Sequence, residues 1–246
     1  MTASVLIINS NNICLGSDSN VTIDNVKTFT GVKKLHCLCD ELPMAIMNYG
    51  NAEFAFIDFE TIVGEFKKRN EINKLSSVKN IVKNFIEFLK EFTDSEDCDE
   101  FIEYYLNEFK KELIILIQEM DEIDFIEFLK NIETKNLLDF LNDYTIDFSE
   151  IVPNYIVDPE YVNLKLLHAF STYLEDNSVG VVIAGFDKEF NRPSFVNFNL
   201  FFNNNGKIEW KCNYLEENYD GVSILTFAQD DEIKAFIEGI DKYSIQ

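Results

Sequence analysis

The spacing of apolar residues changes twice along this chain of 246 residues, and that change limits the fold more than any other feature. Apolar residues alternate in short runs before residue 50, follow a helical spacing between 75 and 150, and alternate again after 177. Strands grouped at both ends with helices between them predict an α+β fold, in which two antiparallel sheets are covered by helices.

Local patterns predict the individual elements. Two β-favouring runs at 3–8 and 13–17 enclose four turn-forming residues, so we expect a hairpin there. Further strands are expected at 35–39, 43–49, 179–185, 194–202, 207–214 and 222–227. Helices are expected from a sharp turn at Gly50 to 69, throughout 75–150, at 159–174 and at 230–240. Asp158 and Pro159 suit the N-cap and first turn of the third of these.

Acidic residues are concentrated in the helical stretch. Residues 91–150 hold 19 Asp and Glu against 4 Lys, which is about two thirds of the net charge of −23 in a quarter of the chain. This composition boundary predicts three segments. The first part of the main domain would span 1–72, an acidic helical insertion 73–157, and the second part of the main domain 158–246.

The composition also excludes several kinds of partner. A net charge of −23 disfavours nucleic acid and anionic membranes, because phosphate contacts need clustered Lys and Arg. No apolar run approaches the roughly 20 residues needed to cross a bilayer. A signal peptide is not indicated, so we expect a cytoplasmic location. Five scattered cysteines without a pair of CxxC motifs favour buried, reduced thiols, and we expect no metal or other cofactor.

Thr2 is a candidate nucleophile at the start of the first strand. If Met1 is removed, Thr2 carries both a hydroxyl and a free α-amine, and an amine with a pKa of about 8 can act as the base for its own hydroxyl. Taken alone, Thr2 is better explained as the first residue of an edge strand. Asp18 at a strand end, Lys34 at the opening of a strand and Gly50 in a turn also have ordinary structural explanations.

Together these residues give the chain a resemblance to a known family. Thr2, residues 16–18 (Gly-Ser-Asp) and Lys34 match, without a gap, the spacing in the proteasome β-subunit and its bacterial two-tier relatives. These are threonine peptidases of the N-terminal nucleophile hydrolase superfamily. Residues 49–53 (Tyr-Gly-Asn-Ala-Glu) take the place of the family's Gly-x-x-Ala-Asp, and residues 179–187 resemble its central strand.

The resemblance implies a fold and a mechanism. The fold would be a four-layer αββα sandwich of antiparallel sheets, with the helical insertion and a C-terminal part shorter than in the family. Thr2 would attack a peptide carbonyl, Lys34 would favour the deprotonated forms of the Thr2 hydroxyl and amine, and Asp18 would orient Lys34. A backbone N–H near Tyr49 and Gly50 would stabilise the oxyanion.

The resemblance also implies substrates and assembly. Thr22 would hold a peptide or protein substrate as an added strand, and the subunits would form a homo-oligomeric ring. Two alternatives remain open. A catalytically inactive relative would serve as a structural or partner-binding subunit through its acidic helical insertion, and an amidase of the same superfamily would act on small molecules.

Overall fold

The computed structural model describes residues 3–23, 27–39, 43–69, 72, 77–93, 95–120, 122–132, 146, 148, 151, 158–188, 191–217 and 219–228. The chain forms two compact units, and each is described by itself. The first comprises Met1–Phe92, Ser178–Leu200 and Trp210–Gln246, and the second comprises Thr93–Asn177 and Phe201–Glu209.

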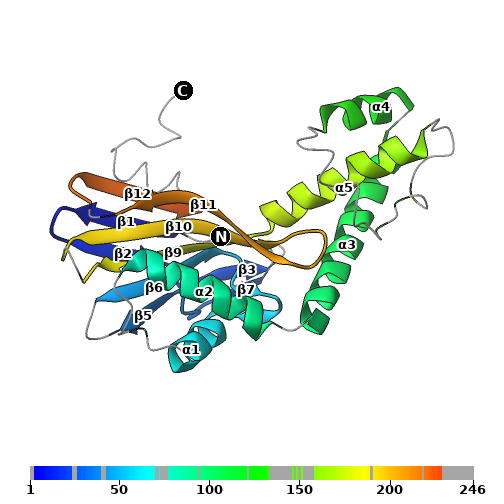
Figure 1. Ribbon diagram of the computed structural model, residues 1–246. Coiled ribbons are helices and arrows are strands. Elements are labelled where there is room, and N and C mark those ends of the chain that lie inside the picture. The colour runs from blue at the N-terminus through cyan, green and yellow to red at the C-terminus, as the bar shows by residue number, and fades with distance from the viewer. Residues whose placement is uncertain are drawn as a thin grey trace, which may run out of the picture. The chain divides into compact units, whose positions relative to one another are not determined.

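The described residues form twelve strands and five helices (Figure 1). The strands are β1 (Ala3–Asn9), β2 (Ile13–Ser17), β3 (Val21–Ile23), β4 (Lys27–Phe29), β5 (Leu35–Cys39), β6 (Met44–Gly50), β7 (Glu53–Phe54), β8 (Ile57–Asp58), β9 (Val179–Phe186), β10 (Pro193–Phe202), β11 (Ile208–Glu216) and β12 (Val222–Ala228). The helices are α1 (Phe59–Arg69), α2 (Val78–Phe92), α3 (Ser95–Gln118), α4 (Glu122–Asn131) and α5 (Pro159–Asp176).

Two larger sheets organise the first unit. One has the order β12-β1-β2 and the other the order β11-β10-β9-β6-β5, while β3-β4 and β7-β8 form small ribbons. Strand β1 lies antiparallel to both of its neighbours, and β6 lies antiparallel to β5 and β9. The predicted α+β class with antiparallel sheets is therefore confirmed at this level.

The alternating pattern of β1 places its two faces in different environments. Leu6 and Ile8 are fully buried in a core shared with Met47 of β6 and Phe195 of β10, whereas Ile7 between them is 44% exposed. Side chains from the two larger sheets therefore meet in one apolar layer. Complete burial of each such side chain contributes about 1.5–3 kcal/mol, so the period-two pattern fixes which face of β1 turns inward.

Helices α1 and α2 belong to the same unit as the sheets. The apolar residues of α1 recur at helical spacing, and they are buried as the sequence predicts: Phe59, Ile62, Val63 and Phe66. Helix α2 begins at Val78, whose backbone N–H donates to the Asp187 carboxylate at 2.8 Å. The same buried carboxylate accepts the Ser194 hydroxyl at 2.6 Å. Asp187 thus ties the start of α2 to the β9–β10 hairpin.

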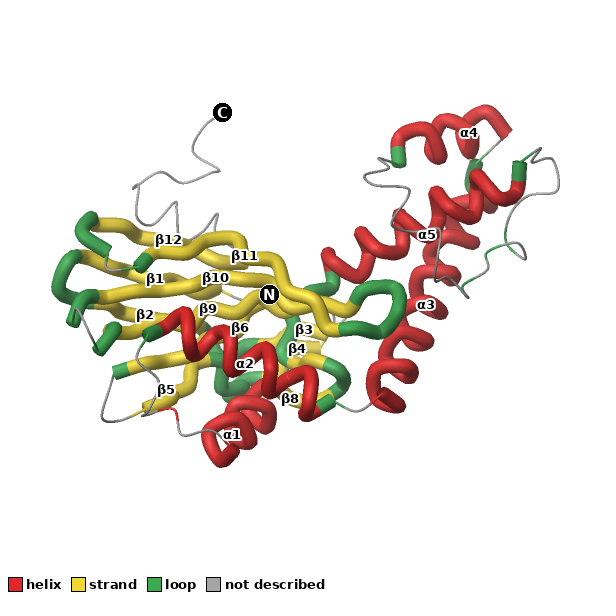
Figure 2. Tube along the Cα trace, in the orientation of Figure 1, coloured by secondary structure: helices red, strands yellow, loops and turns green. Residues whose placement is uncertain are grey.

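Helices α3, α4 and α5 supply the helical part of the second unit (Figure 2). Asp158 accepts the Tyr161 backbone N–H at 3.0 Å, and Pro159 is the first residue of α5, as predicted. The core of this unit gathers apolar side chains from all three helices and from Phe148. Within the described residues, no helix is long and apolar enough to span a membrane.

Three expectations differ from the structure. The helical stretch is divided into α2, α3 and α4 rather than continuous, and the ribbon β7-β8 separates Gly50 from α1. The thiols of Cys14, Cys37 and Cys212 are exposed, so the expectation of buried thiols is wrong for these three. The expected helix at 230–240 lies outside the described residues.

The compact units also divide the chain at other places than the predicted segments 1–72, 73–157 and 158–246. Helix α2, which the prediction assigned to the insertion, lies in the first unit, and α5, which it assigned to the main domain, lies in the second. Long-range contacts cause both differences, because Asp187 holds α2 and the apolar face of α5 packs against α3 and α4.

Candidate functional site

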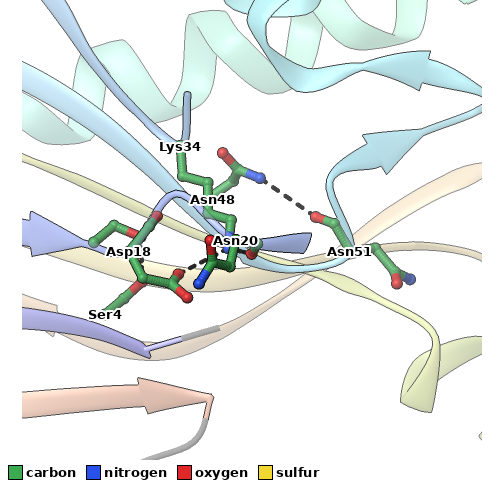
Figure 3. Close-up of polar contacts among 7 residues, drawn as sticks. Ser4, Asp18, Asn20, Lys34, Asn48 and Asn51 are labelled. Atoms are coloured by element: carbon green, nitrogen blue, oxygen red, sulfur yellow. Dashed lines mark hydrogen bonds and ion pairs between the residues drawn. The ribbon is translucent and has the colours of Figure 1, made fainter. Parts of the chain in front are cut away.

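An ion pair between a buried lysine and a partly exposed aspartate joins two of the predicted site residues. The Lys34 ammonium donates to the Asp18 carboxylate at 2.8 Å and also to the Asn20 carbonyl (Figure 3). The Lys34 side chain is 1% exposed and that of Asp18 is 28% exposed. Since an isolated charge in such a site would be strongly destabilised, the two residues depend on each other.

Backbone hydrogen bonds hold both residues at strand ends. Asp18 directly follows β2, and its N–H donates to the Ala3 carbonyl at the start of β1 at 2.9 Å. Lys34 directly precedes β5, and its carbonyl accepts the Asn48 N–H of β6 at 3.0 Å. The pair therefore lies where β1 begins and connects the ends of strands from both larger sheets.

Hydroxyl groups add polar contacts beside Asp18. The Ser4 hydroxyl of β1 lies 2.8 Å from the Ser17 hydroxyl of β2, and Ser17 also donates to the Asp18 carbonyl at 3.2 Å. Ser4 is 1% exposed. These contacts couple the first residues of β1 to the segment that carries Asp18.

Asn48 is a site residue that the sequence analysis missed. Its side-chain amide donates to the Asn51 carbonyl at 3.3 Å, and the side chain lies beside Lys34 (Figure 3). The residue is 1% exposed, and its Oδ1 atom is buried with no hydrogen-bond partner among the described residues. A buried polar group of this kind is unusual, since more than about 90% of such groups are paired. The only sign of Asn48 in the sequence was a polar residue within an otherwise apolar run.

The Tyr49 side chain packs inside the first unit. The ring stacks on Phe227 with 5.2 Å between centroids, and the hydroxyl accepts the Asn197 amide at 2.7 Å. Burial raises the pKa of Tyr49 above its ordinary value. A Cβ atom at Gly180, opposite Tyr49 on β9, would lie 2.1 Å from the tyrosine ring. The Tyr49 ring therefore requires glycine at position 180.

Gly50 ends β6 with a φ of +77°, a conformation that residues with a Cβ rarely adopt. It lies one residue beyond Tyr49 and two beyond Asn48, whose N–H contacts the Lys34 carbonyl. Gly50 therefore lies two residues from Asn48, the residue of β6 that is hydrogen-bonded to Lys34.

The structure does not describe every predicted site residue. Thr2 lies outside the described residues, one peptide bond before Ala3. Thr22 lies in β3, opposite Thr28 of β4 in the strand register, and its side chain is not described. Of the predicted site, the described residues therefore bring together Asp18, Lys34 and the start of β1.

Two further observations bear on the kind of site. Among the described residues, no group of three or more His, Cys, Asp or Glu side chains is arranged to hold a metal ion. The chain matches no protein-family model, and no curated protein is significantly similar to it. The structure therefore defines a class: an α+β protein with two larger antiparallel sheets and an ion pair between buried Lys34 and Asp18 at the start of its first strand.

Proposed function

We propose that the protein is a proteasome-like N-terminal threonine hydrolase that cleaves peptide bonds, with Thr2 as the nucleophile after removal of Met1. One observation carries the proposal. The buried Lys34–Asp18 pair is hydrogen-bonded, through the Asp18 N–H, to the residue that directly follows Thr2. Because the pair is fixed next to the start of β1, its position supports the role that the family resemblance implies for it.

Each residue has a different role in the proposed reaction. The ammonium of Lys34 favours the negative form of a nearby hydroxyl and the neutral form of a nearby amine. Asp18 offsets the lysine charge and fixes its position at 2.8 Å. The amine takes the proton of the Thr2 hydroxyl, and the oxygen attacks the peptide carbonyl. The protonated amine then gives its proton to the leaving peptide nitrogen as the C–N bond breaks, and water hydrolyses the resulting acyl-enzyme. A backbone N–H near Gly50 stabilises the oxyanion.

The fold belongs to the same proposal. Two antiparallel sheets share one apolar core, and α1 and α2 lie in the same unit, which supports an N-terminal nucleophile hydrolase sandwich. Homo-oligomeric ring assembly is expected on the same grounds, and light scattering on a sizing column measures it.

Intact mass and peptide hydrolysis test the proposal together. We expect the purified protein to have lost Met1 and to hydrolyse a panel of fluorogenic peptides. Thr2→Ala should reduce turnover to background. Lys34→Met should also reduce turnover to background, although its intact mass should show that Met1 has been removed. Thr172→Ala, at an exposed position of α5, is the matched control and should retain full activity.

The outcome can also contradict the proposal. Retention of Met1 together with no turnover would refute it and favour the catalytically inactive alternative. Turnover that survives Thr2→Ala would assign the activity to a different residue. Fluorescence of Trp210, the single tryptophan, verifies that the first unit of each variant is folded.

A further inference from the structure

Asn48 of β6 is hydrogen-bonded to two parts of the proposed reaction site. Its backbone N–H donates to the Lys34 carbonyl at 3.0 Å, and its side-chain amide donates to the Asn51 carbonyl at 3.3 Å (Figure 3). Lys34 carries the buried ammonium, and Asn51 directly follows Gly50, near which the oxyanion donor is proposed to lie. One residue therefore links the segment of the lysine to the turn of the donor.

The turn after β6 contains a residue that gives it little stiffness of its own. Gly50 has a φ of +77°, and glycine has more conformational freedom than any other residue. Two carbonyl groups of the turn are held from outside it. The Asn51 carbonyl accepts the Asn48 side chain, and the Ala52 carbonyl accepts the N–H of Phe59 at the start of α1 at 3.0 Å. Because a peptide unit is planar and trans, a fixed Asn51 carbonyl also fixes the direction of the Ala52 N–H.

The burial of Asn48 is not explained by packing. Met44 and Ile46 precede it on the same face of β6, and both are buried and apolar. Asn48 is 1% exposed, and its Oδ1 atom has no hydrogen-bond partner among the described residues. An unpaired buried acceptor is costly, and an apolar side chain at this position would not carry that cost. The side-chain amide of Asn48, rather than its fit in the core, is therefore what distinguishes this position.

We propose that Asn48 is a positioning residue, which holds the turn at residues 50–52 in a fixed place relative to Lys34. It acts through the backbone of the turn and not on the substrate. The reaction needs the Lys34 ammonium and the oxyanion donor in one geometry, since a misplacement of about 1 Å can cost roughly 100-fold in rate. The catalytic effect rests on the proposed function, whereas the hold on the turn does not.

Hydrogen–deuterium exchange measured by mass spectrometry tests the hold on the turn. Asn48→Leu removes the side-chain donor and the unpaired oxygen, but it keeps the backbone N–H that contacts Lys34. We expect the amides of residues 50–52 to exchange roughly fivefold faster or more, the factor for one ordinary hydrogen bond. Asn48→Ala removes the same groups with a smaller side chain and should behave in the same way.

Peptide hydrolysis by the same variants tests the effect on the reaction. We expect kcat to fall about 10-fold to 100-fold while KM stays close to that of the wild type, because an oxyanion donor stabilises the transition state rather than the bound substrate. A residue with a merely structural role would lower the folded fraction and leave kcat per folded molecule unchanged. Fluorescence of Trp210 in the first unit measures that folded fraction.

Asn204 offers a matched control in the second unit. It is 8% exposed, and its Oδ1 atom also has no partner within the part of the chain that the structure describes. Its side-chain amide donates to the Leu167 carbonyl at 3.4 Å. Asn204→Leu is thus the same chemical change outside the candidate site, and it should alter neither the exchange of residues 50–52 nor kcat.

The inference stands if both Asn48 variants accelerate exchange at residues 50–52 and lower kcat, while Asn204→Leu does neither. It is overturned if exchange at these residues matches the wild type, if kcat is unchanged despite faster exchange, or if Asn204→Leu has the same effects. Failure of both Asn48 variants to fold would also overturn it, because Asn48 would then serve stability. If the wild type hydrolyses none of the peptides, the proposed function fails and hydrogen exchange alone decides the role of Asn48.

Discussion

Replacing Asp18 with Asn removes the charge that faces the most deeply buried cation of the candidate site. The Lys34 side chain is only 1% exposed, so water cannot replace the lost carboxylate. Removing one partner of a buried pair costs about 3–5 kcal/mol. We expect about 3 kcal/mol for Asp18→Asn, at the lower end, because the asparagine oxygen and the Asn20 carbonyl still accept hydrogen bonds from Lys34.

The reverse replacement should cost less, and this asymmetry follows from the structure. Lys34→Met leaves the Asp18 carboxylate, which is 28% exposed and can be hydrated. We expect about 1–2 kcal/mol, the cost of a lost hydrogen bond to a charged group and of the Asn20 carbonyl left without the Lys34 donor. The double variant should resemble Lys34→Met, because no buried charge remains in either.

Urea unfolding followed by tryptophan fluorescence measures these differences. Trp210 is the only tryptophan and lies in the first unit, so its signal reports the unit that holds the ion pair. The midpoint should shift while the slope stays constant. The reasoning is refuted if Asp18→Asn destabilises no more than Lys34→Met, or if the two single costs add in the double variant.

Three further predictions concern the first unit. Burial lowers the pKa of His36 below its ordinary 6.5, so on acidification the imidazole is protonated in the unfolded chain before it is protonated in the folded one. Urea midpoints should therefore fall as pH drops from 6.5 toward 5, and they should fall less for His36→Phe. Asp187→Ala removes the acceptor for the first α2 N–H and should cost about 2–3 kcal/mol in urea unfolding; a loss below about 0.5 kcal/mol would contradict the tie to α2. Gly180→Ala should cost at least about 1–3 kcal/mol, because its Cβ would overlap Tyr49, and adding Tyr49→Ala should recover part of the loss; costs that simply add would exclude the clash.

Local patterns predicted most of the described elements because strand and helix periods depend on neighbouring residues. The hairpin of β1 and β2, the buried face of α1 and the N-cap Asp158 were all readable from the sequence. Each of these features needs only a short stretch of chain to be recognised.

The candidate site was readable only in part. Asp18 and Lys34 were singled out by their spacing, and the structure places their charged groups 2.8 Å apart. Asn48 was missed, because an asparagine in an apolar run gives no sign of which groups surround it. The contact of the Tyr49 hydroxyl with Asn197, 148 positions away, has no local signal either.

By itself the sequence determined the α+β class, the positions of most strands and helices, and the acidic character of the central helices. The pairing of Asp18 with Lys34 was expected only from the family resemblance. Only the tertiary structure decided that α2 joins the sheets while α5 joins the other helices, that Tyr49 requires Gly180, and that Lys34 is buried. The physical reason is that burial and partner choice arise from contacts between residues distant in the chain, which no local period records.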